Sequence, residues 1–86
     1  MPEVSRFYGI VIKIFYDDHN PPHFHAEYGE YELLVNINTL AILGGSFPAR
    51  ALGMVTEWAS LRQRELAAAW EKASQLQAPG KIDPLP

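Results

Sequence analysis

The sequence lacks cysteine altogether among its 86 residues. A chain without thiols has no disulfide framework, no thiolate metal site and no cysteine nucleophile. Since disulfides belong to oxidising compartments, their absence favours a cytoplasmic location. The chain also lacks any apolar run near the 18 residues that a membrane span needs, and its N-terminus does not have the pattern of a signal peptide. We therefore expect no association with a membrane.

Basic side chains are few, with seven lysines and arginines against ten acidic residues and a net charge of −3. Proteins that bind nucleic acid non-specifically use many cations to neutralise phosphates, so the net charge does not favour nucleic acid as a partner, although a local basic patch could still bind it. The length accommodates one small domain. A hydrophobic content of 48% and a charged content of 20% are typical of a folded globular protein.

Alternating apolar, β-branched and aromatic residues predict a first strand from Phe7 to Tyr16. Both faces of this strand are apolar, which indicates a central strand or one covered by another surface, such as a second copy. Turn-forming residues separate three further predicted strands, at residues 23–28, 31–37 and 40–43. The short connections favour an antiparallel meander.

One long helix is predicted after the last strand, with Ser46 as its cap and Pro48 in its first turn. Its apolar stripe consists of Leu52, Val55, Trp58, Ala59, Leu66, Ala69, Trp70, Ala73 and Leu76. We therefore expect an α+β fold: a four-stranded, mainly antiparallel sheet (a meander) with one long C-terminal helix packed on one face. Residues 1–76 form this single domain, and residues 77–86 form a C-terminal tail or a strap across the surface.

The three histidines of the chain, His19, His23 and His25, lie within seven residues. Alternation along a strand places His23 and His25 on one face, about 6–7 Å apart, close enough to share an ion. His19 could fold back across Pro21 and Pro22 to join them. The alternative is that these residues only line the solvated face of a strand.

Carboxylates near the histidines could complete a set of nitrogen and oxygen ligands for a divalent transition metal such as zinc, nickel, manganese or iron. Either Asp17 or Asp18 could contribute from the preceding turn, and Glu27 continues the face of His23 and His25. We therefore predict His19, His23 and His25 as metal ligands, with Asp18 and Glu27 as further candidates. No other cofactor is indicated.

Arg62 falls near the middle of the apolar stripe of the helix, where an unpaired charge is costly. Its head group could reach water while its stem packs on Trp58. Alternatively, it could pair with a carboxylate of the sheet or help to bind a phosphate. Arg62 and Asn20, which lies inside the histidine block, are two further candidate functional positions. The two tryptophans are predicted to be core residues rather than platforms for bases.

The order of these elements resembles a bacterial domain of unknown function, DUF4160. The resemblance covers about residues 1–76 and depends on the block from Asp18 to Ala26, on Tyr28-Gly29-Glu30-Tyr31 and on Glu57-Trp58-Ala59 in the helix. It implies a small bacterial protein whose partner is a neighbouring small protein of family DUF2442, in an arrangement like that of a toxin and its antitoxin. It implies no settled activity.

Two functions follow from these observations. The first is a protein-interaction module of a two-gene, toxin–antitoxin-like system, which binds its partner or a second copy through a sheet edge or the doubly apolar first strand. The chain has no obvious nucleophile and no cofactor fingerprint, which favours assembly over chemistry. The alternative is a metal-dependent hydrolase or nuclease that uses His19, His23 and His25.

Overall fold

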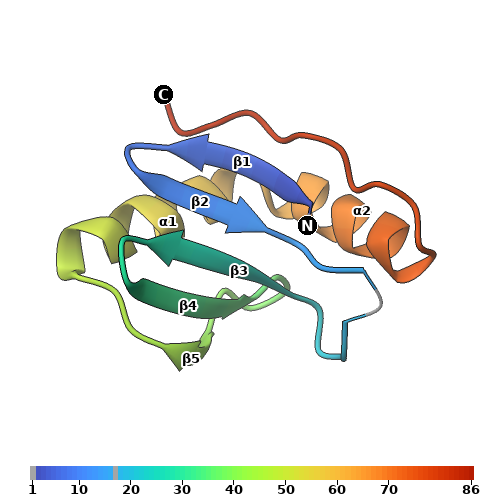
Figure 1. Cartoon of the computed structure of the whole chain (residues 1–86), viewed down its shortest axis with the longest axis horizontal. Coiled ribbons are helices and arrows are strands. Elements are labelled where there is room, and N and C mark those ends of the chain that lie inside the picture. The colour runs from blue at the N-terminus through green and yellow to red at the C-terminus, as the bar shows by residue number, and fades with distance from the viewer. Residues whose placement is uncertain (1, 17) are drawn as a thin grey trace.

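The computed structural model describes residues 2–16 and 18–86, and it has the predicted α+β architecture. Its antiparallel strands follow one another in the sheet in chain order, as a meander. Both helices lie behind the same face of this sheet, and the other face is open (Figure 1). No helix in residues 2–16 and 18–86 has the length and apolar character that crossing a membrane requires. The elements are β1 (Glu3–Phe7), β2 (Ile10–Lys13), β3 (His23–Tyr28), β4 (Tyr31–Asn36), β5 (Ile42–Gly45), α1 (Ala49–Leu61) and α2 (Gln63–Ser74).

The sheet has five strands rather than four, because the predicted first strand is in fact a hairpin. Tyr8 and Gly9 have positive φ angles of 49° and 82°, and β1 and β2 pair on either side of them. Two successive residues with positive φ are the usual requirement of a tight hairpin turn. The chain therefore reverses inside a run whose composition is that of a continuous strand.

The next hairpin agrees with the sequence, whereas the last strand is displaced. β3 has the predicted bounds, and β4 pairs with it along its whole length. The amides of Asn38 and Thr39 donate to the side-chain oxygen of Asn36, and the amide of Leu40 donates to its main-chain oxygen. These bonds extend the turn, so β5 begins at Ile42 instead of Leu40.

The predicted long helix is two helices with a break at Arg62. This residue has φ −121° and ψ 18°, and its amide donates to the carbonyl of Ala59, which ends α1. The side-chain amide of Gln63 donates to the carbonyls of Ile37 and Asn38, which anchors the start of α2 to the β4–β5 loop. Ser46 does not cap α1 as predicted. Its amide donates to a carbonyl of β4, as an extension of the pairing with β5.

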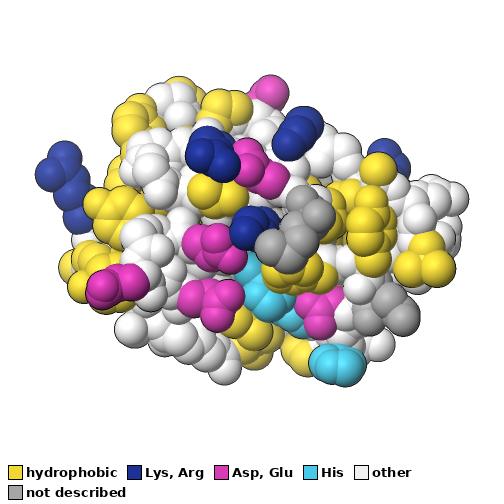
Figure 2. Space-filling view, viewed as in Figure 1, with side chains coloured by type: hydrophobic (Ala, Val, Ile, Leu, Met, Phe, Trp, Pro, Cys, Tyr) yellow, Lys and Arg dark blue, Asp and Glu magenta, His cyan; other side chains and the backbone are white. Residues whose placement is uncertain are grey.

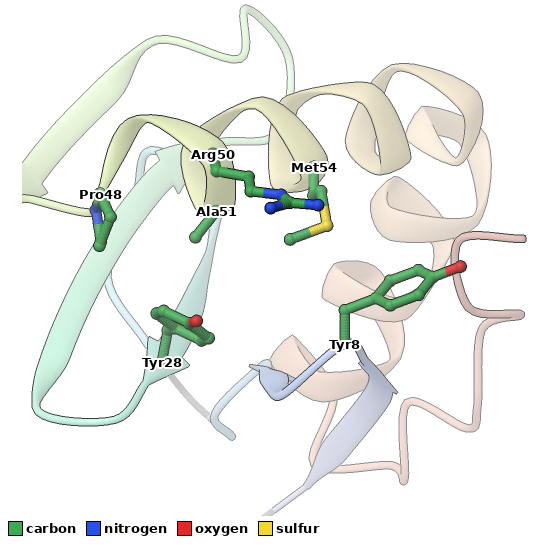
Figure 3. A pocket seen from close by; sticks show the side chains of 6 residues that line it. All are labelled: Tyr8, Tyr28, Pro48, Arg50, Ala51 and Met54. Carbon is green, nitrogen blue, oxygen red and sulfur yellow. The ribbon is translucent and has the colours of Figure 1, made fainter.

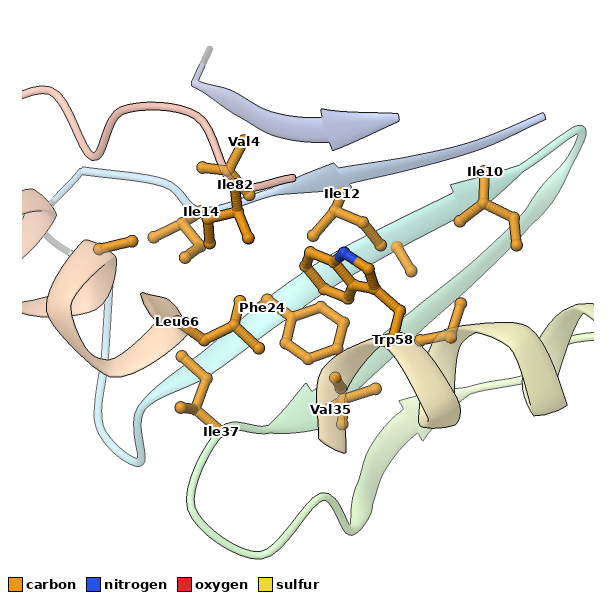
Figure 4. Close-up of a cluster of buried hydrophobic side chains, with 14 of the residues drawn as sticks. Val4, Ile10, Ile12, Ile14, Phe24, Val35, Ile37, Trp58, Leu66 and Ile82 are labelled. Atoms are coloured by element: carbon orange, nitrogen blue, oxygen red, sulfur yellow. The ribbon is translucent and has the colours of Figure 1, made fainter. Parts of the chain in front are cut away.

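The core lies between the sheet and the two helices (Figure 4). Trp58 of α1 is fully buried, and its ring centroid lies 5.3 Å from that of Phe7 and 5.8 Å from that of Phe24. Trp70 of α2 is 9% exposed, so the structure confirms both tryptophans as core residues. Burial of these large side chains supplies much of the stabilisation available to so short a chain.

The segment that follows α2 runs beside β1 (Figure 1). The amide of Ile82 donates to the carbonyl of Val4, and the indole N–H of Trp58 donates to the main-chain oxygen of Asp83. Ile82 and Leu85 are buried in the core. The edge of the sheet at β1 is therefore covered. Leu76, which we placed on the apolar stripe, is 70% exposed because α2 ends at Ser74.

Candidate metal centre

The connection between β2 and β3 brings a carboxylate against two histidines of β3. The Oδ2 atom of Asp18 lies 3.0 Å from Nε2 of His23 and 3.2 Å from Nε2 of His25. One ligand atom from each of the three residues lies within 4.8 Å of the other two. Histidine and acidic side chains gather in this region of the open sheet face (Figure 2). We refer to Asp18, His23 and His25 as the Asp-His-His cluster.

His23 is fixed by its own turn. Its side chain is 8% exposed, its Nδ1 atom lies 2.8 Å from the carbonyl oxygen of Pro21, and its ring packs 5.3 Å from that of Trp70. A carbonyl can only accept, so Nδ1 carries the proton, and a neutral imidazole has no second N–H. Nε2 of the neutral ring therefore presents a lone pair to the Asp18 carboxylate. A cation bound by both groups would stabilise this arrangement.

The two distances from Asp18 to the histidines fit a transition-metal ion. Such ions bind histidine nitrogen and carboxylate oxygen at about 2.0–2.2 Å, so ligand atoms lie about 3.0 Å apart at right angles and about 3.4 Å apart in a tetrahedron. The separations of Asp18 Oδ2 from the two Nε2 atoms, 3.0 and 3.2 Å, lie within this range. The two histidine nitrogens lie within 4.8 Å of each other, and they must come within about 4.2 Å to share one ion. Two imidazoles and one carboxylate also leave coordination positions free for water or substrate. The cluster can therefore hold an ion and keep it accessible.

Groups around the cluster orient its ligands. The bond from His23 Nδ1 to a main-chain carbonyl is the usual support of a metal-binding histidine, and Oδ1 of Asp18 accepts the amide of His19 at 2.9 Å. His25 has no such support, since its Nδ1 atom is buried without a hydrogen-bond partner among the described residues. His23 and Asp18 are thus better oriented than His25.

The carboxyl group of Asp18 is held in its charged form. Burial raises its pKa, but the hydrogen bonds from the His25 side chain and the His19 amide, together with electrostatic interactions with His23 and His25, outweigh burial, so the pKa of Asp18 is below its ordinary value of 3.8. A carboxylate that stays ionised at neutral pH is the form that binds a cation.

Two neighbours of the cluster were not identified from the sequence as parts of a site. Lys13 of β2 pairs directly with His25 of β3, so their side chains share the open face. The ring of Phe15 lies edge-on to that of His25, with centroids 4.5 Å apart. The period of the first predicted strand places Lys13 and Phe15 on one face. Only the register between β2 and β3 shows that His25 lies opposite them.

The structure separates the other predicted ligands from the cluster. The side chain of His19 is exposed, and its main-chain amide alone contacts Asp18. The carboxylate of Glu27 lies on the open face, 3.0 and 3.1 Å from Nζ of Lys13, rather than against the histidines. Asp17 is outside the described residues. Of the predicted carboxylates and histidines, the structure brings together Asp18, His23 and His25.

The two other candidate positions are Asn20 and Arg62, and the interactions described for them are with other parts of the chain than the cluster. Asn20 is exposed, and its peptide bond to Pro21 is cis. Arg62 stands between the helices, with its side chain 24% exposed and Nη1 3.6 Å from the carboxylate of Glu65 one turn later. Its Nε atom is buried without a partner among the described residues. Arg62 thus pairs with a residue in the first turn of α2 rather than with the sheet.

Comparison with known proteins identifies the family of the chain. No curated protein matches the sequence, and no solved structure does. Residues 9–71 match a family described as a domain of unknown function, DUF4160. The match includes the whole Asp-His-His cluster and well over half of the chain. The chain therefore belongs to the family DUF4160.

Proposed function

We propose that this protein is a metal-dependent hydrolase whose ion is held by Asp18, His23 and His25. The observation that carries the proposal is the placement of one carboxylate oxygen of Asp18 between the Nε2 atoms of two histidines. The proton on Nδ1 of His23 leaves the facing nitrogen as a ligand. A bound divalent ion would supply a Lewis acid that activates water at neutral pH.

Three residues beside the cluster, Glu27, Lys13 and Phe15, would contribute to such a reaction. Glu27 lies two residues from His25 on the same strand face, about 7 Å along the backbone, and its side chain is 36% exposed. It would accept a proton from the attacking water. Lys13, which pairs with Glu27, would stabilise negative charge that develops on the substrate. Phe15 would limit the access of solvent to His25.

The proposal is tested by a hydrolysis assay on tag-free protein. The protein is stripped with chelator, reloaded with zinc, manganese, nickel or iron in turn, and assayed with bis-p-nitrophenyl phosphate and p-nitrophenyl acetate. We expect activity with at least one metal, a loss of about a hundredfold or more in Asp18→Asn and His25→Gln, and unchanged activity in His19→Gln. Equal activity in all variants, or none with any metal, would refute hydrolysis.

The free edge of β5 supports a second proposed function, protein interaction. β5 is the last strand of the sheet, so among the described residues its outer edge is unpaired, whereas the edge at β1 is covered by the C-terminal segment. Ile42 and Leu43 on β5 are 50% and 45% exposed. An exposed apolar edge strand is a template for pairing with another chain. The partner we propose is the small DUF2442-like protein of a two-gene system, or a second copy.

Light scattering on the protein alone and with its genomic neighbour tests this second function. We expect a complex at micromolar concentration that Leu43→Lys at the edge disrupts, while Leu61→Lys, on an exposed site of α1, leaves it intact. If the wild-type protein remains a monomer and ignores its neighbour, the interaction function is wrong.

A further inference from the structure

A second concave site lies at the end of β3 opposite to the Asp-His-His cluster. It is a half-open pocket of about 270 Å³ between the β1–β2 turn, the end of β3 and the start of α1 (Figure 3). Its lining residues are Tyr8, Tyr28, Pro48, Arg50, Ala51 and Met54. Tyr28 lies five positions after His23 on β3, a distance of about 16 Å along the strand, so this pocket is distinct from the cluster.

Two tyrosine rings form walls of the pocket. Tyr8 has a φ of 49° at a turn position that Asn or Gly normally occupies, and its side chain is 61% exposed. Its hydroxyl donates to the main-chain oxygen of Pro86, which fixes the ring. Tyr28 packs on Phe47, with ring centroids 6.1 Å apart, and Gly9 leaves room for its edge. Contacts outside the pocket thus hold both rings in place, so the walls are formed before a ligand arrives.

Arg50 gives the pocket its charge. In Figure 3 its side chain extends beside Met54, toward the space between the two rings. No carboxylate lines the pocket, and Arg50 makes no ion pair or side-chain hydrogen bond with the described residues. In contrast, Arg6 and Arg62 pair with Glu3 and Glu65. A guanidinium recognises carboxylate and phosphate groups through two parallel hydrogen bonds, so Arg50 is available to an anion.

We propose that this pocket binds a small ligand that consists of a planar aromatic ring carrying one carboxylate or phosphate group. The ring packs against Tyr8 and Tyr28, and the anionic group pairs with Arg50. Stacked and edge-on aromatic contacts contribute beyond the burial of area, and the thioether of Met54 adapts to the edge of a ring. The volume lies just below the range of about 300–1,000 Å³ that is usual for ligand sites, which limits the ligand to one or two fused rings.

Calorimetric titration in the presence of chelator tests the proposal, since the chelator removes any contribution from a metal ion. The probes are indole-3-carboxylate and 1-naphthyl phosphate, with indole and 1-naphthol as their neutral counterparts. We expect at least one anionic probe to bind with Kd below about 1 mM, and its neutral counterpart to bind about tenfold more weakly or worse. The probe that binds decides between carboxylate and phosphate.

Three variants locate the binding. Arg50→Gln removes the cation and is expected to weaken binding about tenfold or more, whereas Arg64→Gln, at an exposed site on α2, leaves it unchanged. Tyr8→Asn removes one wall while it supplies a residue that the turn favours, so binding falls while the melting temperature is kept or raised. Binding of neither anionic probe below about 5 mM, or wild-type affinity in Arg50→Gln, would overturn the proposal.

Discussion

Replacing His23 by alanine in the metal-free protein tests how much the buried contacts of this residue stabilise the fold. Its side chain is 8% exposed, its Nδ1 atom donates a hydrogen bond to the carbonyl oxygen of Pro21 over 2.8 Å, and its ring centroid lies 5.3 Å from that of Trp70. The lost hydrogen bond is worth about 1 kcal/mol, and an aromatic contact about 0.5–1.5 kcal/mol beyond the area it buries. With the cavity that alanine leaves, we expect the free energy of unfolding to fall by about 2–3 kcal/mol.

Urea denaturation followed by circular dichroism, with chelator present, measures this loss. In a domain of this size each kcal/mol shifts the melting temperature by about 4–8 °C, so His23→Ala should melt about 10–20 °C lower. His19→Ala is the control, because its side chain is exposed and its change should stay within about 0.5 kcal/mol. Equal stability of the two variants would refute the claim that His23 is a buried, oriented ligand.

Three further predictions concern other parts of the fold. With chelator present, the lowered pKa of Asp18 stabilises the wild-type protein above about pH 4, and this stabilisation is lost as the pH falls through that pKa. Asp18→Asn should lack it, so the melting temperatures of the two proteins, measured against pH, should differ at neutral pH and converge in acid. Gly45→Ala should lower the free energy of unfolding by about 2 kcal/mol or more in urea titrations, since the φ of Gly45 is 82° and the added methyl would overlap a carbonyl of β4. Gly53→Ala is the control: this glycine has an open helical position, so alanine there should raise the free energy of unfolding by up to about 1 kcal/mol. Trp58→Phe should cost about 1–3 kcal/mol and raise amide hydrogen exchange in the C-terminal segment that its indole N–H holds.

Local pattern predicts an element well where nothing distant competes with it. β3 has its predicted bounds because residues 23–28 alternate cleanly between Pro22 and Gly29. The first hairpin was missed because its turn uses Tyr8, a residue that rarely adopts positive φ, so Gly9 alone marks it. The helix break was missed because Arg and Gln are good helix formers. At the break, Gln63 donates hydrogen bonds to the β4–β5 loop, and such tertiary contacts cannot be inferred from the local helical pattern.

The sequence predicted the region of the candidate site, but it did not distinguish the three candidates that the structure brings together from the two that it leaves apart. The clustering of histidines in the sequence identifies the region, and alternation places His23 and His25 on one face. The choice between carboxylates depends on strand register, because Glu27 shares that face but lies within reach of Lys13 on β2. Asp18 reaches the histidines through a turn whose path the sequence does not specify. The interpretation of these histidines as merely solvated is wrong for His23, which is buried.

Metal stoichiometry of the tag-free protein tests the central claim most directly. Native mass spectrometry and calorimetric titration with zinc and manganese should show one ion bound per chain, with a melting temperature that rises as metal is added. Asp18→Asn and His25→Gln should lose this binding, and His19→Gln should keep it. Less than about 0.2 equivalents bound by the wild-type protein, with unchanged melting, would contradict the assignment of the Asp-His-His cluster as a metal centre.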